Sequence, residues 1–307
     1  MKFCVLDADY EDEKIVLYGV DKKGMSVKLE DVYTPYFYVL PKNKIGVLKK
    51  LKKNSHVRSV HEEKRLLGKE KVDVLKVVVD KPQNILHVRD AIKHAQDVAG
   101  CYEYTINYCK RYMIDKKILP FSWLDIKGKE LKSSGFARCI KVERMRHAKG
   151  DTPRLKTMAF DIETVDNKVV MISCIDNTGF EKIITYKPCP KKNCTVVTDE
   201  KAMILEFVET VQKRDPDVIV GYNTDQFDFE VLKERCSAYK IELAINRDFS
   251  GIQWIRRTKA SAARLIGRIH VDLLPFVTYV LATQLESEVF NLNAIAQELI
   301  GKGKEDV

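Results

Sequence analysis

Two acidic side chains separated by one residue are the first candidates for chemistry. Asp161 and Glu163 lie in the segment Phe160-Asp161-Ile162-Glu163-Thr164. Side chains alternate along a strand, so both carboxylates face one side and Phe160 and Ile162 face the other. Carboxylates this close repel each other unless a cation lies between them, and oxygen ligands suit Mg²⁺ or Mn²⁺. The alternative is a solvated strand end with two surface acids, because an Asp-x-Glu triplet alone is common.

A second group of polar residues follows an apolar strand. Residues 217–221 are Asp-Val-Ile-Val-Gly, and the chain continues through Asn223 and Asp225 to Asp228. An acid in the first turn of a helix, next to the end of a strand, can point back over the sheet. The alternative interpretation of such an acid is a helix N-cap, which we prefer for Asp225.

The spacing of apolar residues predicts two sets of elements. In the first half we expect a meander of strands, a basic helix, a further strand and a helix after Pro82, at 3–10, 14–20, 25–30, 36–40, 44–53, 73–79 and 84–98. In the second half we expect strands at 157–162, 169–175, 182–186 and 217–221, and helices at 200–213 and from about 228. Strands interleaved with helices predict an α/β sandwich with a mixed sheet.

A chain of 307 residues favours two domains. We expect an N-terminal domain over 1–126, a connector or peripheral hairpin over 127–156, and a second domain over 157–307. Residues 1–150 carry 32 basic and 20 acidic side chains (net +12), whereas residues 151–307 carry 21 and 24 (net −3). This asymmetry indicates one domain that contacts a polyanion and another that holds cations.

Apolar runs and the N-terminal sequence exclude some classes. No apolar run is long enough to span a bilayer, and acids occupy the place where a signal peptide needs an apolar stretch. We therefore expect a cytoplasmic protein without a membrane partner.

Taken together, these motifs carry a resemblance. FDIET at 160–164 and VGYNTDQFDFEVLKERC at 220–236 resemble the first and second exonuclease motifs of family B DNA polymerases. The resemblance to archaeal members extends in colinear order through DADY, TPYFYVL, KPQNILHVRDAI, CKRYMID and GRIHVDLLPF. It implies an α/β (α+β) architecture, in which a small mixed α/β domain precedes a ribonuclease-H-like domain of the DEDD 3′–5′ exonuclease type with a mixed central sheet.

The resemblance also implies a metal site. Asp161, Glu163 and Asp228 match ligands of two Mg²⁺ or Mn²⁺ ions, with Asp161 bridging the pair and Glu163 orienting a water. The family's third motif, which carries a fourth Asp, is expected shortly after Gly301, and the sequence given ends at Val307. We expect Asp272 to be structural rather than that fourth ligand, and Glu305 and Asp306 to lie on a frayed tail.

Further residues match positions that contact DNA. Asn223 and Phe227 match contacts of the frayed primer 3′ end, and we place Tyr222 with them. Basic residues interleaved with aromatic ones, among them Lys110 and Arg111, predict a surface for single strands. The alternatives are core packing for Phe227 and a solvated face for the basic residues.

In archaeal relatives the N-terminal domain captures deaminated template bases such as uracil in a pocket. The matching positions here are Tyr10, Pro35, Tyr36, Phe37, Pro82, Gln83, Ile85, Arg89 and Tyr108. A flipped base needs apolar walls and groups that read its Watson–Crick edge. The alternative is that these residues simply form the core of a small β domain.

The function expected is therefore binding of single-stranded and primer–template DNA and two-metal removal of 3′-terminal nucleotides, once downstream sequence completes the site. The polymerase remainder, encoded by the same gene or as a split subunit, is an expected partner, as is a sliding clamp bound through the missing part. Alternatives are a catalytically inactive DNA-binding or uracil-sensing module, the short subunit of a split polymerase, and a free-standing DEDD nuclease.

Overall fold

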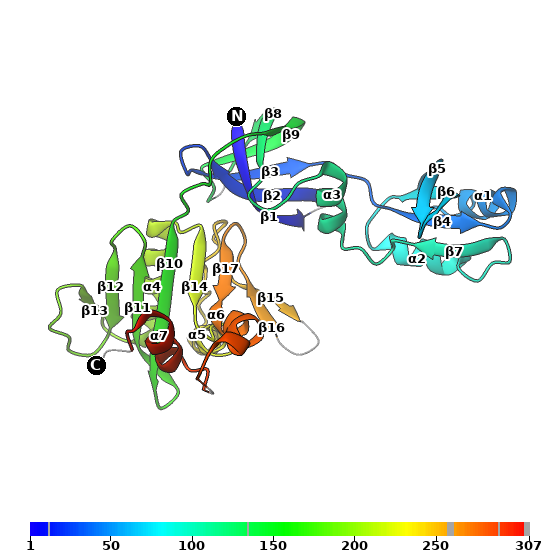
Figure 1. Cartoon of the computed structure of the whole chain (residues 1–307). Helices are drawn as coiled ribbons and strands as arrows, with labels where there is room; N and C mark the ends of the chain where they lie inside the picture. Colours follow the sequence, from blue (N-terminus) through cyan, green and yellow to red (C-terminus); the bar gives the residue numbers. More distant parts are fainter. Residues whose placement is uncertain (12, 134, 257–260, 288, 304–307) are drawn as a thin grey trace. The chain divides into compact units, whose positions relative to one another are not determined.

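The structure, a computed structural model, describes residues 1–11, 13–133, 135–256, 261–287 and 289–303 (Figure 1). It divides into two compact units. Unit 1 contains Met1–Tyr18, Lys28–Leu131 and Cys139–Gly150, and unit 2 contains Gly19–Val27, Lys132–Arg138 and the chain from Asp151 onward. Within the described ranges, no helix has the length and apolar character needed to cross a membrane.

A closed barrel forms the first part of unit 1. Its strands, in the order β1-β2-β3-β9-β8, are β1 (Lys2–Glu11), β2 (Lys14–Asp21), β3 (Ser26–Asp31), β9 (Arg138–Ala148) and β8 (Trp123–Leu131). The segment expected as a connector or peripheral hairpin thus contains a hairpin that closes the barrel instead of lying at its periphery. The physical reason is burial, since Leu124, Ile126 and Ile140 on these two strands are almost fully enclosed.

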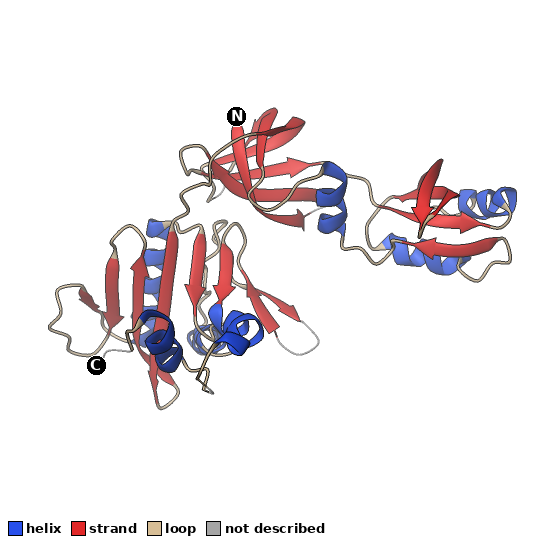
Figure 2. Cartoon of the chain, in the orientation of Figure 1, coloured by secondary structure: helices blue, strands red, loops and turns tan. Residues whose placement is uncertain are grey.

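A four-stranded sheet forms the other part of unit 1 (Figure 2). Its elements, in chain order, are β4 (Tyr36–Pro41), α1 (Lys44–Lys52), β5 (Val57–Leu67), β6 (Glu70–Val79), α2 (Asn84–Ile92) and β7 (Val98–Tyr102), followed by α3 (Tyr108–Lys116). The strand order is β5-β6-β4-β7. The segment at 36–40 is therefore a strand, as expected, but it belongs to this sheet and not to a meander with the three strands before it.

The two faces of this sheet differ. Phe37 and Val39 pack with residues of α1 and α2, including Val47 and Val88, in one buried cluster. Tyr36 and Tyr38, which alternate with them on β4, belong to a second cluster on the other face. Period-two alternation along β4 thus separates an aliphatic, helix-covered face from a tyrosine-bearing face.

Unit 2 is built on a six-stranded mixed sheet in the order β13-β12-β11-β10-β14-β17. Its strands are β10 (Thr157–Val165), β11 (Lys168–Asp176), β12 (Glu181–Thr185), β13 (Cys194–Val196), β14 (Val218–Gly221) and β17 (Ile269–Asp272). The remaining elements are α4 (Glu200–Arg214), α5 (Asp228–Tyr239), the β15 (Gln253–Arg256) and β16 (Ser261–Arg264) hairpin, α6 (Leu273–Phe276), η1 (Val277–Leu281), η2 (Ala282–Gln284) and α7 (Leu292–Ile300).

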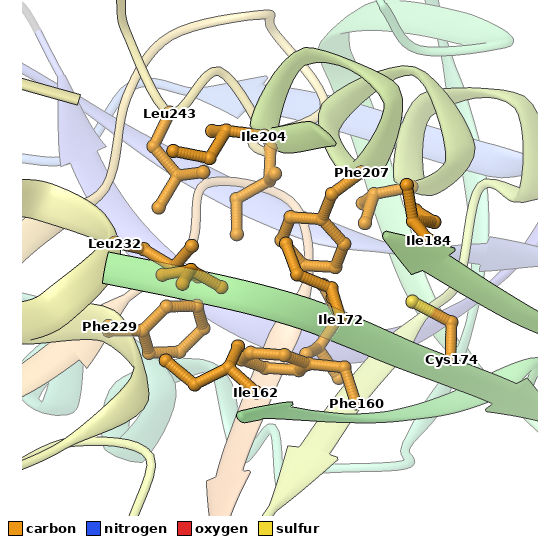
Figure 3. Close-up of a cluster of buried hydrophobic side chains, with 14 of the residues drawn as sticks. Phe160, Ile162, Ile172, Cys174, Ile184, Ile204, Phe207, Phe229, Leu232 and Leu243 are labelled. Atoms are coloured by element: carbon orange, nitrogen blue, oxygen red, sulfur yellow. The ribbon is translucent and has the colours of Figure 1, made fainter. Parts of the chain in front are cut away.

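Helices α4 and α5 cover one face of the sheet. Ile204 and Phe207 of α4 and Phe229 and Leu232 of α5 are fully buried against strand residues such as Ile172 (Figure 3). The helix α4 begins at a capped N-terminus, where the Asp199 side chain accepts a hydrogen bond from the Ala202 N–H at 2.8 Å. The expected α/β sandwich with a mixed sheet is confirmed.

A short loop over 132–138 is clustered with unit 2. Gly135 has a φ of +79°, and a Cβ atom there would lie 1.4 Å from the carbonyl oxygen of Arg247. The Arg247 side chain is itself buried and donates to Asp215 at 2.8 Å and to Asp217 at 2.7 Å. Only glycine therefore fits at position 135, both for its backbone conformation and for this close approach.

One buried carboxylate joins both helices to the sheet. Glu200, which is 4% exposed, accepts hydrogen bonds from the Val169 N–H at 2.8 Å, from the Arg235 guanidinium at 2.7 and 2.8 Å, and from the Tyr239 hydroxyl at 2.8 Å. These contacts hold the Arg235 cation in place. The hydrogen bonds from the Arg235 and Tyr239 side chains lower the pKa of Glu200. The position of α5 relative to β11 thus depends on a fully hydrogen-bonded buried ion pair.

We expect Glu200→Ala to lower the free energy of unfolding by about 2–4 kcal/mol, because it leaves the Arg235 guanidinium and the Val169 N–H without their partner. The matched control is Glu209→Ala on the same helix, which removes only an exposed pair with Lys213 and should leave the free energy of unfolding nearly unchanged. Urea denaturation followed by circular dichroism measures both. Equal losses for the two variants would contradict this role of Glu200.

Candidate active site

The strand β10 presents its acids on the face opposite the helices. Phe160 and Ile162 are 5% and 4% exposed, and the Phe160 ring packs 5.2 Å from Phe207 and 5.1 Å from Phe229 (Figure 3). Asp161 and Glu163 alternate with them and are half-buried. Both carboxylates therefore lie on one side of the strand, as predicted.

Asp228 joins this strand from the neighbouring segment of the chain. Strand β14 runs parallel to β10 through the pairs Thr157↔Val218 and Ala159↔Val220 and ends at Gly221. Beyond that end, the Ile162 N–H donates to Oδ1 of Asp228 at 3.2 Å. The Asp228 carboxylate thereby takes the place of a backbone acceptor where the ladder between the two strands has stopped.

The turn between β14 and α5 is held from the adjacent strand. Asp272, at the end of β17, accepts hydrogen bonds from the Asn223 N–H at 2.8 Å and the Asp225 N–H at 3.0 Å. Asn223 adopts a left-handed φ of 66°. Asp272 also accepts from the Leu274 N–H and caps α6, so in this structure it is a positioning residue.

Two buried side chains, Thr224 of this turn and His270 of β17, join the turn to the adjacent strand, and of these only Thr224 was not anticipated. Thr224 is fully buried, and its hydroxyl lies 2.9 Å from Nε2 of His270, which contacts the Ala263 carbonyl through Nδ1 at 3.2 Å. Burial lowers the His270 pKa, which favours the neutral imidazole as a bridge between the two elements. The alternation of residues 269–272 was the one sequence signal that placed His270 in the interior.

The N-cap interpretation of Asp225 is wrong. The residue that precedes α5 is Phe227, and no side chain caps this helix. Oδ1 of Asp225 accepts a hydrogen bond from the Ala263 N–H at 2.6 Å instead. Asp225 lies too early in the turn for capping and ties it to β16.

The electrostatics of Asp228 are those of a buried acid beside another acid. Asp228 is 2% exposed, and burial, with Asp161 as the next contribution, raises its pKa from 3.8 to about 7. The hydrogen bond from the Ile162 N–H acts in the opposite direction but does not compensate. Two carboxylates held this close in a poorly solvated place favour a bound positive charge.

The three acidic side chains offer the donor type that a divalent cation needs. Asp161, Glu163 and Asp228 supply only oxygen, as Mg²⁺ and Mn²⁺ require. Across the ranges that the structure covers, no three His, Cys, Asp or Glu side chains are arranged to hold a metal ion. The donor type and the charge fit such a cation, whereas a complete coordination shell is not assembled. Glu305 and Asp306 lie outside the described residues.

The residues predicted to contact DNA are placed differently from one another. Phe227 is 43% exposed and hence not a core residue, Asn223 is half-buried beside it in the turn, and the Tyr222 hydroxyl donates to the Phe290 carbonyl at 2.6 Å. Lys110 is exposed on α3. Arg111 is not: it is 8% exposed and its guanidinium pairs with Glu103, so its charge is not presented to a phosphate.

The structure brings together part of the predicted base-capture set. A cavity of about 700 Å³ is lined by residues that include Pro35, Pro82 and Tyr108. The Tyr10 ring meets Tyr108 edge-on at 5.4 Å, and its hydroxyl donates to Gln83 at 3.3 Å.

Four other members of that set lie elsewhere. Phe37 and Ile85 are buried in the helix-covered cluster, and Tyr36 belongs to the tyrosine-bearing face of the sheet. Arg89 pairs with Asp90 and stacks over Tyr104 at 4.3 Å. For Phe37 and Ile85 the structure agrees with core packing, the alternative that the sequence left open.

Comparison with known proteins assigns the chain to a family. A family model described as "DNA polymerase family B, exonuclease domain" matches residues 100–295. The chain is 32% identical to the DNA polymerase of Thermococcus kodakarensis over 99% of its own length and 17% of that protein, and 32% identical to the DNA polymerase of Pyrococcus glycovorans over 99% and 37%. The solved structure of the family B DNA polymerase from the hyperthermophilic archaeon Pyrobaculum calidifontis is similar, with a TM-score of 0.83, 29% identity and coverage of 97% of this chain and 39% of that one.

The chain therefore belongs to the family B DNA polymerases and carries the exonuclease domain of that family. It spans between 17% and 38% of the length of the curated relatives that it matches first. The resemblance seen in the sequence motifs is confirmed by these comparisons.

The raised pKa of Asp228 predicts a pH-dependent stability in metal-free buffer. The folded state binds this proton more tightly than the unfolded state, so the free energy of unfolding falls as the pH rises from about 3.8 to about 7. We expect Asp228→Asn to remove this fall and to be more stable than the wild type by roughly 2–4 kcal/mol at pH 8.

The measurement is urea denaturation in EDTA at several pH values between 4 and 8. The control is Asp166→Asn in the exposed turn after β10, where the pH dependence should stay that of the wild type. If Asp228→Asn kept the wild-type slope, the carboxyl group would not be the titrating group inferred here.

Proposed function

We propose that this chain is the template-binding and proofreading part of a family B DNA polymerase, which removes 3′-terminal nucleotides when downstream sequence completes its site. The observation that carries the proposal is the buried Asp228 carboxylate beside Asp161 at the end of a strand ladder. Membership of the family and of its exonuclease domain supports it.

In this proposal Asp161, Glu163 and Asp228 hold divalent cations. Bound Mg²⁺ or Mn²⁺ supplies activation of a water and stabilisation of the leaving 3′ oxygen. The chain's own residues do the positioning. The hydrogen bond from the Ile162 N–H fixes the Asp228 carboxylate, and Asp272 fixes the backbone of Asn223 and Asp225.

Phe227 is proposed to position the substrate. It is 43% exposed directly before Asp228, where its ring can stack on the terminal sugar or base. The helices α4 and α5 and the Glu200 network keep this turn rigid, which is what a site for in-line attack requires.

We expect Asp161→Asn to abolish saturable Mn²⁺ binding by this chain, since the substitution removes the charge nearest to Asp228. Mn²⁺ binding is measured by electron paramagnetic resonance, and hydrolysis of a labelled single strand is followed in parallel. The control Asp166→Asn should bind Mn²⁺ as the wild type does.

Two bound Mn²⁺ ions in the wild type would support the exonuclease proposal. One ion or none, or binding that Asp161→Asn leaves unchanged, would favour the alternative of a DNA-binding module without catalysis. Hydrolysis that appears only when downstream sequence is added would identify the missing part as the source of the remaining ligand.

Single-stranded and primer–template DNA, the remaining polymerase domains and a sliding clamp are the partners that this proposal implies, in a cytoplasmic, nucleoid-associated setting. The chain covers 17–38% of the length of the matched polymerases. This supports the proposal that it works with further polymerase domains, either in one polypeptide or as a split subunit.

We further propose that unit 1 binds a deaminated template base in the cavity beside Pro35, Pro82 and Tyr108. The supporting observation is that Tyr108, which lines the cavity, contacts the Tyr10 ring, and that the Tyr10 hydroxyl is hydrogen-bonded to Gln83. Apolar walls and backbone groups are the features with which proteins read an extruded pyrimidine.

We expect this chain to bind a uracil-containing single strand more tightly than the thymine-containing strand of the same length, because the thymine methyl group does not fit. Fluorescence anisotropy at matched salt measures the two affinities. Tyr108→Leu should reduce the difference. Equal affinities for the two strands in the wild type would remove this proposal.

A further inference from the structure

The tyrosine-bearing face of the four-stranded sheet carries a second cavity. The sheet has the chain order β4-α1-β5-β6-α2-β7, and both helices pack on the opposite face. On the other face, Tyr36 and Tyr38 of β4 lie next to Val74 of β6, and Tyr38 is paired with Tyr102 of β7. Tyr36 and Tyr38 are each 5% exposed, and Arg111, Ile114 and Asp115 of α3 line the cavity with them, so the cavity lies between this tyrosine-bearing face and α3.

The cavity has a volume of about 400 Å³, in the range of small-ligand sites. Its lining includes the three tyrosines and Val74, which are largely buried, and Leu66, Leu67 and Ile114, which are 68%, 41% and 58% exposed. Exposed apolar side chains beside buried aromatic rings form a site into which a flat, weakly polar group can enter from solvent.

Arg111 gives the cavity an unused donor. Its side chain is 9% exposed and it lines the cavity. Its guanidinium pairs with Glu103 through another nitrogen and lies over the Tyr36 ring at 5.1 Å, yet Nε has no hydrogen-bond partner among the residues that the structure describes. A buried donor left without an acceptor costs free energy, so this guanidinium would gain from an additional acceptor beside it.

The charges of the lining favour a base over a phosphate. Arg65 and Arg111 supply donors, while Glu103 and Asp115 supply acceptors, so the polar rim is nearly neutral. A phosphate would be repelled by the two carboxylates, whereas a nucleobase edge carries both donors and acceptors. Arg65 also stacks over Tyr38 at 5.0 Å, which adds a second planar surface.

We propose that this cavity, here called the Tyr102 pocket and lined by Tyr36, Tyr38, Tyr102, Arg65, Arg111 and Glu103, binds one unstacked nucleobase of a single-stranded nucleic acid. The helix α3, which contributes Arg111, carries the exposed Lys110, and the exposed Lys117 follows its last residue; both can meet the flanking phosphates. The site is distinct from the cavity beside Pro82 and deepens the proposed binding of single strands by unit 1, on which it rests.

The test compares a fluorescein-labelled 12-nucleotide mixed-sequence DNA strand with an abasic strand of equal length and charge, by anisotropy on the 307-residue chain. We expect the strand with bases to bind about tenfold more tightly. Tyr102→Leu should remove most of that difference and leave the abasic strand unaffected. The matched control is Tyr186→Leu in unit 2, which should preserve the difference.

A second variant moves the ring instead of removing it. A Cβ atom at Gly100 would lie 2.9 Å from the Tyr102 hydroxyl, so Gly100→Ala displaces the tyrosine without changing its chemistry. We expect a loss of base-dependent affinity similar to that of Tyr102→Leu, with circular dichroism confirming that both variants fold. An RNA strand of the same sequence is included because either sugar could carry the base, and Tyr102-dependent binding of either strand supports the proposal.

Equal affinity of the wild type for the two DNA strands would overturn this inference, as would base-dependent binding that Tyr10→Leu abolishes and Tyr102→Leu does not. The second result would assign the effect to the cavity beside Pro82. Mn²⁺ binding at Asp161 is measured on the same variants and should be unchanged, so a failure here is separable from a failure of the exonuclease proposal.

Discussion

The arrangement of unit 2 depends on how a parallel strand pair ends. Strand β14 stops at Gly221 while β10 continues, which leaves the Ile162 N–H in the interior without a strand to receive it. A carboxylate from the following helix accepts that hydrogen bond, and its burial next to Asp161 is the consequence. A neutral acceptor for the Ile162 N–H would avoid the cost of burying a carboxylate and would make the fold more stable. It would also attract a cation less strongly.

Local alternation explains why the centre of the site could be predicted. Phe160 and Ile162 differ so strongly in polarity from Asp161 and Glu163 that only one face of β10 can be apolar, whatever the strand packs against. The strands β5 and β8–β9 gave no such signal. All of the side chains of β5 are exposed or half-buried, and β8 completes its pairing only with β1, a strand far away in sequence.

Partner choice was the part that the sequence could not settle. The cationic character of Arg111 is evident from its type, but Glu103 and Tyr36 reach it only after α3 packs on the sheet. Asp225 is likewise of a residue type that often caps helices, but its carboxylate accepts a hydrogen bond from Ala263, 38 residues later. Side chains with several possible partners are decided by tertiary proximity, whereas apolar alternation is decided within a few residues.

Unit 2 is made from three separate stretches of chain, which has a consequence for dissecting the molecule. A polypeptide that started at Asp151 would contain the sheet and both helices but would lose the loop whose Gly135 packs against the Arg247 carbonyl. The backbone of Arg247 would then lose a packing partner that it has in the intact chain. Because the segments of the two units alternate along the chain, no single cut separates one unit from the other, and gene fusions or deletions should respect this interleaved order.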